Sequence, residues 1–264
     1  MDGRTGREDG GIMLTTAGRQ SWIVTCRRAE GVRVVGIPYA GGGPAMFRSW
    51  AQELPSNIEL CAVQLPGREG RMKEEPIRDL RDVVDELAEA ITGVLDRPIV
   101  LFGHSIGGLI AFELTRELRR RYGFEPVHLF VSGCPAPQSS IGELLYDLPD
   151  AEFLEHMRRF NGTPKEVLEH PELMQLLLPV LRADFALRDT YEYREEPPLD
   201  CPISCFGGMD DREVDFAKLE GWRRHTNGSF EWTMFQGDHF FVRSSQTAVL
   251  DALSLVCTRA TAQV

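Results

Sequence analysis

The chain has 264 residues, of which 42% are hydrophobic and 26% charged, and its formal net charge is −11. This composition is typical of a globular protein with a large core and excludes a disordered chain. The negative charge disfavours binding to nucleic acid or to an anionic membrane surface. Six scattered cysteines form no CxxC pair, so we expect neither a disulfide scaffold nor a metal site.

The N-terminal stretch is rich in glycine and lacks the apolar region of a signal peptide. No later window holds the roughly 18 uninterrupted apolar residues of a membrane span. We therefore expect a flexible segment at residues 1–18, a single domain at residues 19–264 and a cytoplasmic location. We also expect a monomer without nucleic-acid or membrane partners.

Short apolar runs rich in β-branched residues predict strands, and helical patterns lie between several of them. Residues 76–95 and 106–122 space their apolar residues three and four apart, and the first of these patterns begins at a proline. Strands alternating with helices predict an α/β fold, with a mostly parallel sheet and helices on both faces. The predicted strands are residues 22–26, 33–39, 58–65, 98–103, 127–133, 202–208 and 230–235.

The alternation stops between Cys134 and Pro202, where the sequence is helical and polar. Asp150 is placed to cap one helix, and residues 163–166 (TPKE) have the pattern of another helix start. We expect a helical lid insertion at about residues 136–198, because long insertions in compact domains tend to cover functional sites. The alternative is that these helices pack on a face of the sheet.

Residues 103–107 (GHSIG) fit the motif G-x-S-x-G between a predicted strand and a predicted helix. The motif holds its serine at a sharp turn, where flanking glycines remove Cβ clashes. A structural Gly-rich loop is the alternative, but the strand-to-helix context favours a nucleophile. We therefore expect Ser105 to be the nucleophile of an acyl-transfer reaction.

A serine nucleophile needs a histidine base, which a carboxylate orients. His239 follows a late predicted strand and precedes the last predicted helix, so it is the expected base. The other histidines lie beside the nucleophile, within an apolar strand, on the lid or at a helix end: His104, His128, His156, His170 and His225. The carboxylate should follow the preceding strand, where Asp210 and Asp211 are both candidates and spacing alone does not separate them.

The developing oxyanion needs two amide donors. One is the residue after the nucleophile, Ile106, and the other should follow an early strand, where Ala40 precedes three glycines. A phosphate cradle is the alternative for this glycine run. The run lacks the Lys-Ser/Thr of a P-loop and the spacing of a dinucleotide fingerprint, which favours the oxyanion interpretation.

Over about residues 20–258 the sequence resembles the type II (editing) thioesterases of polyketide and nonribosomal peptide synthesis, members of the α/β-hydrolase superfamily. General esterases share the GHSIGG segment but not the LPGRE and LPVLRADF segments. The resemblance rests on the segments PYAGGGPAMFRSW, VQLPGREGR, GHSIGG, LLLPVLRADFALRDTYEYREEPPLDCPI, GGMDD and GDHFFV.

The resemblance also implies site residues. It supports Ser105 as nucleophile, His239 as base, and the amides of Ala40 and Ile106 as oxyanion donors. The family's acid ends a G-x-x-D motif, with a small apolar residue three positions later and a tryptophan eleven positions later. Four residues meet this register and favour Asp211 over Asp210: Gly208, Asp211, Val214 and Trp222. Many members have proline directly after the acid, where this chain has arginine.

The implied function is hydrolysis of misprimed or stalled acyl groups from the phosphopantetheine arm of acyl or peptidyl carrier proteins. No metal or bound cofactor is implied, because the partner carries the phosphopantetheine. A carboxylesterase, a product-releasing thioesterase or acyltransferase, and an idle carrier-binding module are the alternatives. The sequence does not decide which arginines bind the carrier protein; the candidates are Arg116, Arg119, Arg120, Arg158 and Arg159. It also does not decide whether five lid residues line an acyl channel or form the lid's own core: Leu144, Leu145, Phe153, Leu177 and Phe185.

Overall fold

The computed structural model describes residues 21–139, 142–160, 162 and 170–261. Two predictions therefore lie outside the described residues, the flexible segment at residues 1–18 and the helix start at residues 163–166.

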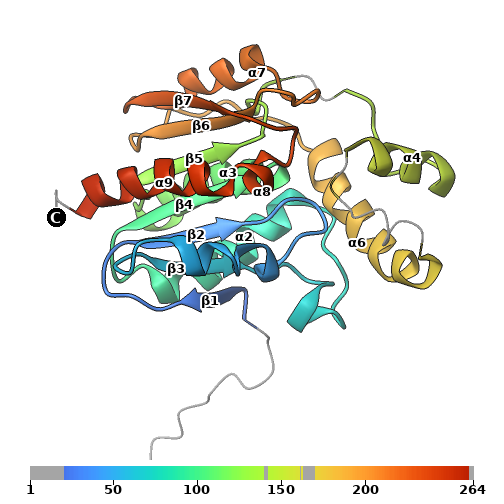
Figure 1. Cartoon of the computed structure of the whole chain (residues 1–264), viewed down its shortest axis with the longest axis horizontal. Helices are drawn as coiled ribbons and strands as arrows, with labels where there is room; N and C mark the ends of the chain where they lie inside the picture. The colour runs from blue at the N-terminus through green and yellow to red at the C-terminus, as the bar shows by residue number, and fades with distance from the viewer. Residues whose placement is uncertain (1–20, 140–141, 161, 163–169, 262–264) are drawn as a thin grey trace, which may run out of the picture.

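The described residues form one seven-stranded sheet with the order β1-β3-β2-β4-β5-β6-β7. All neighbouring strands are parallel except β1 and β3, which are antiparallel. Figure 1 shows the strands side by side, with β1 at one edge and β7 at the other. Every predicted strand is present, with these bounds: β1 Ile23–Arg27, β2 Arg33–Ile37, β3 Glu59–Val63, β4 Ile99–His104, β5 His128–Ser132, β6 Ile203–Gly208 and β7 Phe230–Phe235.

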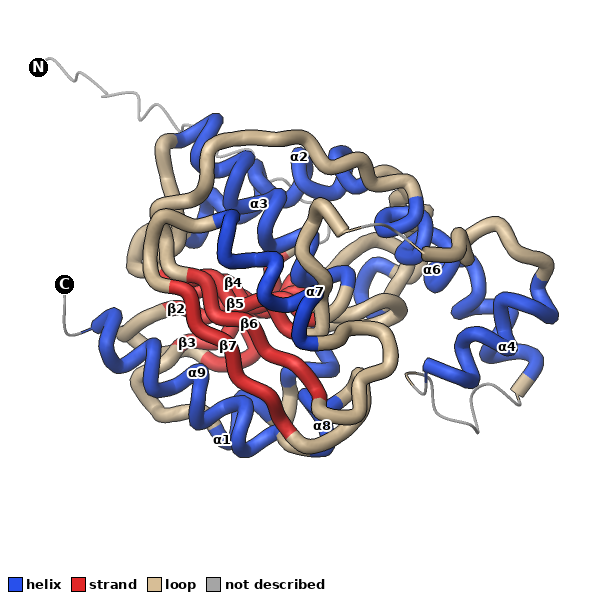
Figure 2. The backbone as a smooth tube through the Cα atoms, turned by 90° about the horizontal axis from the view of Figure 1, so that it is seen from above, coloured by secondary structure: helices blue, strands red, loops and turns tan. Residues whose placement is uncertain are grey.

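Helices cover both faces of the sheet, as Figure 2 shows from above. The inner strands alternate their side chains between two cores: in β4, Leu101 packs with one, while Val100 and Phe102 pack with the other. A sheet buried on both faces requires such continuous apolar strands. One core includes residues of α2 (Leu80–Ile91), α3 (Ile106–Tyr122) and α7 (Phe216–Glu220), and the other residues of α1 (Trp50–Glu53), α8 (Phe241–Ser244) and α9 (Gln246–Thr261).

The predicted helix at residues 106–122 has the expected bounds, but the one predicted at 76–95 begins later, at Leu80. The Asp79 side chain accepts a hydrogen bond from the Arg81 amide and so caps the helix there. This cap overrides the proline as the start signal. The same helix ends at Ile91 and continues as a short 3₁₀ helix, η3 (Thr92–Val94). The other 3₁₀ helices are η1 Pro44–Phe47, η2 Glu69–Arg71 and η4 Gly221–His225.

Two helices of the predicted lid region, α4 (Asp150–Phe160) and α6 (Pro171–Asp189), lie beyond one end of the sheet in both views (Figures 1 and 2). The described residues between 136 and 198 contain helices and loops and no strand. The prediction for Asp150 was wrong in one respect, because the helix begins at this residue. Its carboxylate accepts a hydrogen bond from Arg182 at 2.6 Å, which joins α4 to α6.

Buried histidines make the stability of this fold sensitive to acid. Burial lowers the pKa of His128 from 6.5 to about 4, and burial with two nearby arginines does the same for His225. Between these pH values the unfolded chain binds protons that the folded chain does not, so the free energy of unfolding falls as the pH falls. The shift at His128 corresponds to about 3 kcal/mol.

We therefore expect urea unfolding to show a progressive loss of stability from about pH 6.5 to pH 4. His128→Gln is the informative variant, since Gln can keep the 2.8 Å contact that the imidazole makes with Ser204 Oγ but cannot titrate. Its stability should fall less steeply across this range. Equal slopes in wild type and variant would contradict the assignment of the acid sensitivity to His128.

Candidate active site

Ser105 lies at the turn between β4 and α3, with φ 56° and ψ −125°. A non-glycine residue at positive φ is strained, and the surrounding structure must hold it there. Here the Ser105 amide donates to the Ser132 carbonyl at 2.8 Å, and the Ser105 carbonyl accepts from the Gly108 amide at 2.9 Å. The turn places the serine side chain at the carboxyl end of the sheet, where it lines a pocket.

The glycines on either side of the serine are required by close backbone contacts. A Cβ on Gly103 would lie 2.0 Å from the Gly107 carbonyl oxygen, and a Cβ on Gly107 would lie 2.3 Å from the Ile37 carbonyl oxygen. Neither carbonyl can move without moving its whole strand or helix. The motif thus lets α3 begin directly against β4 and the end of β2.

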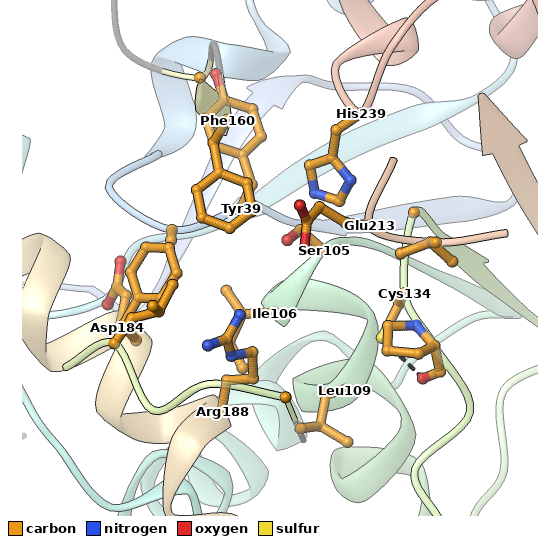
Figure 3. A pocket seen from close by; sticks show the side chains of 18 of the residues that line it. Tyr39, Ser105, Ile106, Leu109, Cys134, Phe160, Asp184, Arg188, Glu213 and His239 are labelled. Carbon is orange, nitrogen blue, oxygen red and sulfur yellow. Dashed lines mark hydrogen bonds between the residues drawn. The ribbon is translucent and has the colours of Figure 1, made fainter. Parts of the chain in front are cut away.

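His239, in the loop after β7, is held by a buried carboxylate. Its Nδ1 lies 2.8 Å from Asp211 Oδ2, and the Asp211 side chain is fully buried. Since an ionised carboxylate only accepts hydrogen bonds, Nδ1 carries the proton and donates it, leaving Nε2 free to accept. Figure 3 shows the imidazole beside Ser105 at the pocket wall.

The two adjacent aspartates have different surroundings. Asp211 Oδ1 accepts hydrogen bonds from the amides of Glu213 and Val214 at 2.8 and 3.1 Å, while its second oxygen contacts His239. Asp210 is exposed, and its amide donates to the Gly237 carbonyl. The structure thus brings Asp211 together with the histidine and turns Asp210 to solvent.

A second histidine lies beneath the first. His104 is fully buried, its Nδ1 is 2.9 Å from Ser132 Oγ, and its ring centroid is 5.2 Å from that of His239. Burial, and secondarily the nearby His239, holds the pKa of His104 well below 6.5. The neutral His104 ring therefore packs against the ring of His239 without adding a charge beside it.

Ala40 and Ile106 line the same pocket as Ser105. Ile106 is the first residue of α3, so its amide has no acceptor within the helix and lies at the positive end of the helix dipole. Ala40 lies in a turn in which the Gly42 amide donates to the Tyr39 carbonyl at 2.8 Å, and Gly41 has φ +75°. Both expected oxyanion donors therefore lie at the wall of the cavity that holds the serine.

The pocket has a volume of about 580 Å³ and lies between the end of the sheet and helices α4 and α6. Of the five candidate channel residues, Leu145 and Phe185 line the pocket and also belong to the apolar cluster of this region. Phe153 and Leu177 belong to the cluster but do not line the pocket, and Leu144 is exposed. The pocket walls combine apolar side chains with charged ones that the sequence did not place there: Glu143, Arg159, Asp184, Arg188, Glu213 and Lys218.

Cys134 also lines the pocket, but it does not compete as a nucleophile. Burial raises the pKa of its thiol to about 12, so the sulfur stays protonated at neutral pH. Within the described part of the chain, no cluster of three or more His, Cys, Asp or Glu side chains is arranged to hold a metal ion. None of the described helices has the length and apolarity that a membrane span requires.

Comparisons with known proteins identify the family of this chain. The family model described as a thioesterase domain matches residues 33–255. The chain belongs to the thioesterase family. This thioesterase is 48% identical over 235 residues to the Brevibacillus parabrevis protein named linear gramicidin dehydrogenase LgrE, covering 87% of this chain and 89% of that protein. It is 43% identical over 233 residues to the gramicidin S biosynthesis protein GrsT of Aneurinibacillus migulanus, covering 87% and 91%.

Among solved structures, the type II thioesterase BorB from the borrelidin biosynthetic cluster matches with a TM-score of 0.83 and 32% identity, over 90% of this chain and 99% of that chain. The present protein is accordingly a type II thioesterase of nonribosomal peptide and polyketide pathways, a serine hydrolase with the α/β-hydrolase fold. The family, enzyme class and fold expected from the sequence are confirmed.

The arginines considered for carrier docking are mostly engaged within the thioesterase. Arg116 is buried and pairs with Glu113 and Glu196, and Arg119 and Arg120 also pair with Glu196. These ion pairs tie α3 to the segment that follows α6. The other two, Arg158 and Arg159, are exposed on α4 and pair with Glu155.

Proposed function

We propose that this thioesterase hydrolyses acyl groups from the phosphopantetheine arm of acyl or peptidyl carrier proteins, through an acyl-serine intermediate on Ser105. Such an activity removes misprimed or stalled acyl groups from a synthetase. The observation that carries the proposal is the Ser105, His239 and Asp211 arrangement at the wall of a 580 Å³ cavity.

In the first half-reaction, Ser105 Oγ attacks the thioester carbonyl carbon while His239 Nε2 takes the hydroxyl proton. Asp211 stabilises the imidazolium through the 2.8 Å contact with Nδ1. The carbonyl π electrons move to oxygen, and the amides of Ala40 and Ile106 donate to that oxyanion. When the intermediate collapses, the C–S bond breaks and the pantetheine sulfur takes the proton from His239.

In the second half-reaction, a water molecule enters and His239 removes its proton as the oxygen attacks the acyl-serine carbonyl. The same two amides stabilise the second oxyanion. Collapse breaks the ester bond, Ser105 Oγ recovers the proton, and the free carboxylic acid leaves. All of these steps use side chains and amides of the chain, and phosphopantetheine enters with the partner.

The dehydrogenase function in the name of the Brevibacillus relative is not part of this proposal. The glycine run that follows β2 does not have the dinucleotide spacing G-x-G-x-x-G. Ala40, which precedes this run, instead lines the serine pocket, and Gly41 contacts the C-terminal half of α6 through Asp184.

The test follows acyl removal by intact mass on a carrier protein loaded with acetyl, hexanoyl or decanoyl thioester, beside a panel of simple nitrophenyl esters. Wild type should remove the carrier-bound acyl groups, and quenching at early times should show the acyl mass on the enzyme. Ser105→Ala lacks the nucleophile and is the negative control. Cleavage of the esters while every carrier thioester survives would replace the proposal with a carboxylesterase. Transfer of the acyl group to an added amine or alcohol in place of water would indicate an acyltransferase.

A further inference from the structure

A buried ion pair lies at the pocket wall, between two segments that are 116 residues apart. Arg68 donates from Nη1 and Nη2 to the two carboxylate oxygens of Asp184, at 2.7 and 2.8 Å. The Arg68 and Asp184 side chains are only 7% and 2% exposed. Such a bidentate contact fixes the orientation of both groups.

The pair also holds the loop that carries Ala40. The Gly41 amide donates to Asp184 Oδ2 at 2.6 Å, and Arg68 Nη1 donates to the Gly42 carbonyl at 3.1 Å. The two residues after Ala40 are thus each bound through a backbone group by one member of the pair. Figure 3 shows Asp184 on the side of the pocket away from His239.

Glycine restricts the backbone less than any other residue, so this glycine-rich loop needs contacts from other segments to hold its conformation. Gly41 has φ +75°, and a Cβ there would lie 2.7 Å from Leu181 Cδ2. Leu181 and Asp184 are three residues apart, hence on one face of α6. One side chain packs on Gly41, and the other binds its amide.

The segments LPGRE and LPVLRADF, which general esterases lack, meet at the pair of Arg68 and Asp184. Arg68 follows Gly67, whose φ is +84°, and a Cβ on Gly67 would lie 2.7 Å from Pro76 and 3.3 Å from Val180 of α6. Glu69 Oε1 accepts from the Ala45 amide at 3.0 Å, beyond the glycine run. The two segments therefore contact the loop of residues 40–45, here called the oxyanion loop, at Gly41, Gly42 and Ala45.

We propose that Arg68 and Asp184 are positioning residues, which hold the Ala40 amide where it meets the transition-state oxyanion. The inference rests on the proposed function of the same site. Oxyanion stabilisation requires donors that are in place before the reaction, at 2.7–3.1 Å from the oxygen. Loosening the loop should therefore slow acylation and deacylation and leave substrate binding nearly unchanged.

The test compares Arg68→Lys and Asp184→Asn with wild type on a carrier-bound thioester. We expect kcat to fall by roughly 10- to 100-fold, less than the loss of an oxyanion donor itself. The Kd for the loaded carrier, measured in the Ser105→Ala background, should change less than about threefold. An alkyl boronic acid, whose tetrahedral adduct with Ser105 needs the oxyanion donors, should lose affinity in parallel with kcat. If Asp184→Asn does not fold, Asp184→Glu keeps the charge, displaces the carboxylate and should show the same pattern.

A second buried pair provides the matched control. Arg33 and Glu59 are both 6% exposed, with Arg33 Nε 2.5 Å from Glu59 Oε2, and they lie where β2 and β3 begin, at the opposite end of the sheet. Arg33→Lys and Glu59→Gln should lower the Tm by amounts similar to those of the test variants. Their kcat and boronic acid affinity should stay within about twofold of wild type, because the oxyanion loop is untouched.

The outcomes separate the two proposals. If wild type does not hydrolyse carrier thioesters, the proposed function fails. If wild type does so and the Arg68 and Asp184 variants keep their kcat and boronic acid affinity, or lose no more of either than the Arg33 and Glu59 variants, only the positioning role is overturned.

Discussion

Replacing Asp211 with asparagine is expected to lower kcat for acyl removal by about 10³- to 10⁴-fold, with little change in folding. The asparagine oxygen can still accept from the amides of Glu213 and Val214, as Asp211 Oδ1 does. Its NH₂ group, however, would face His239 Nδ1 and donate to it. The histidine proton would then reside on Nε2, where it prevents the ring from accepting the Ser105 proton.

Asp210→Asn is the matched control for this prediction. It makes the same chemical change one residue away, on a side chain that is exposed to solvent. Its kcat should stay within about twofold of wild type, as is usual for exposed positions. Intact-mass kinetics on one carrier-bound thioester, with circular dichroism to check folding, measures both variants. A larger loss in Asp210→Asn than in Asp211→Asn would reverse the assignment of the triad acid.

Replacing Gly103 with alanine is expected to destabilise the protein by about 3–5 kcal/mol and to remove activity from any folded fraction. The new Cβ would lie 2.0 Å from the Gly107 carbonyl oxygen and 2.6 Å from the Gly108 amide nitrogen. Relief requires α3 to move away from β4. That movement would displace both Ser105 and the Ile106 amide from the pocket.

Gly93→Ala makes the same substitution where there is room for it. Gly93 lies in η3, and a Cβ there would have no atom within 4 Å apart from those of its chain neighbours and its own helix backbone. Its stability should stay within about 1 kcal/mol of wild type, or rise, because alanine reduces the entropy of the unfolded chain. Urea unfolding and carrier-thioester kinetics test both variants. Wild-type stability and kcat in Gly103→Ala would show that the turn does not depend on this close approach.

The elements that the sequence predicted well depend on local patterns. Apolar runs buried on both sides indicate the strands, and the three- and four-residue spacing of residues 106–122 gives the bounds of α3. The motif around Ser105 is also local, because the strand, the turn and the helix that hold the serine are consecutive in the chain. The first turn of α2 was misplaced because its Asp79 cap was not recognised.

The site depends on contacts between distant segments, and here the sequence alone left alternatives. Asp210 and Asp211 are adjacent, and only the direction in which the loop turns places one against His239. Family resemblance favoured the same residue without giving that reason.

The order of strands and helices along the chain, the serine turn and the family could thus be predicted from the sequence, because each depends on residues that are close together in the chain. Contacts between distant segments show why Asp211, and not Asp210, meets the histidine, and they join Arg68 and Asp184 to the loop that carries Ala40. The physical reason is that hydrogen bonds and close packing act over a few ångströms of space. Chain distance sets no limit on which groups the fold brings within that range.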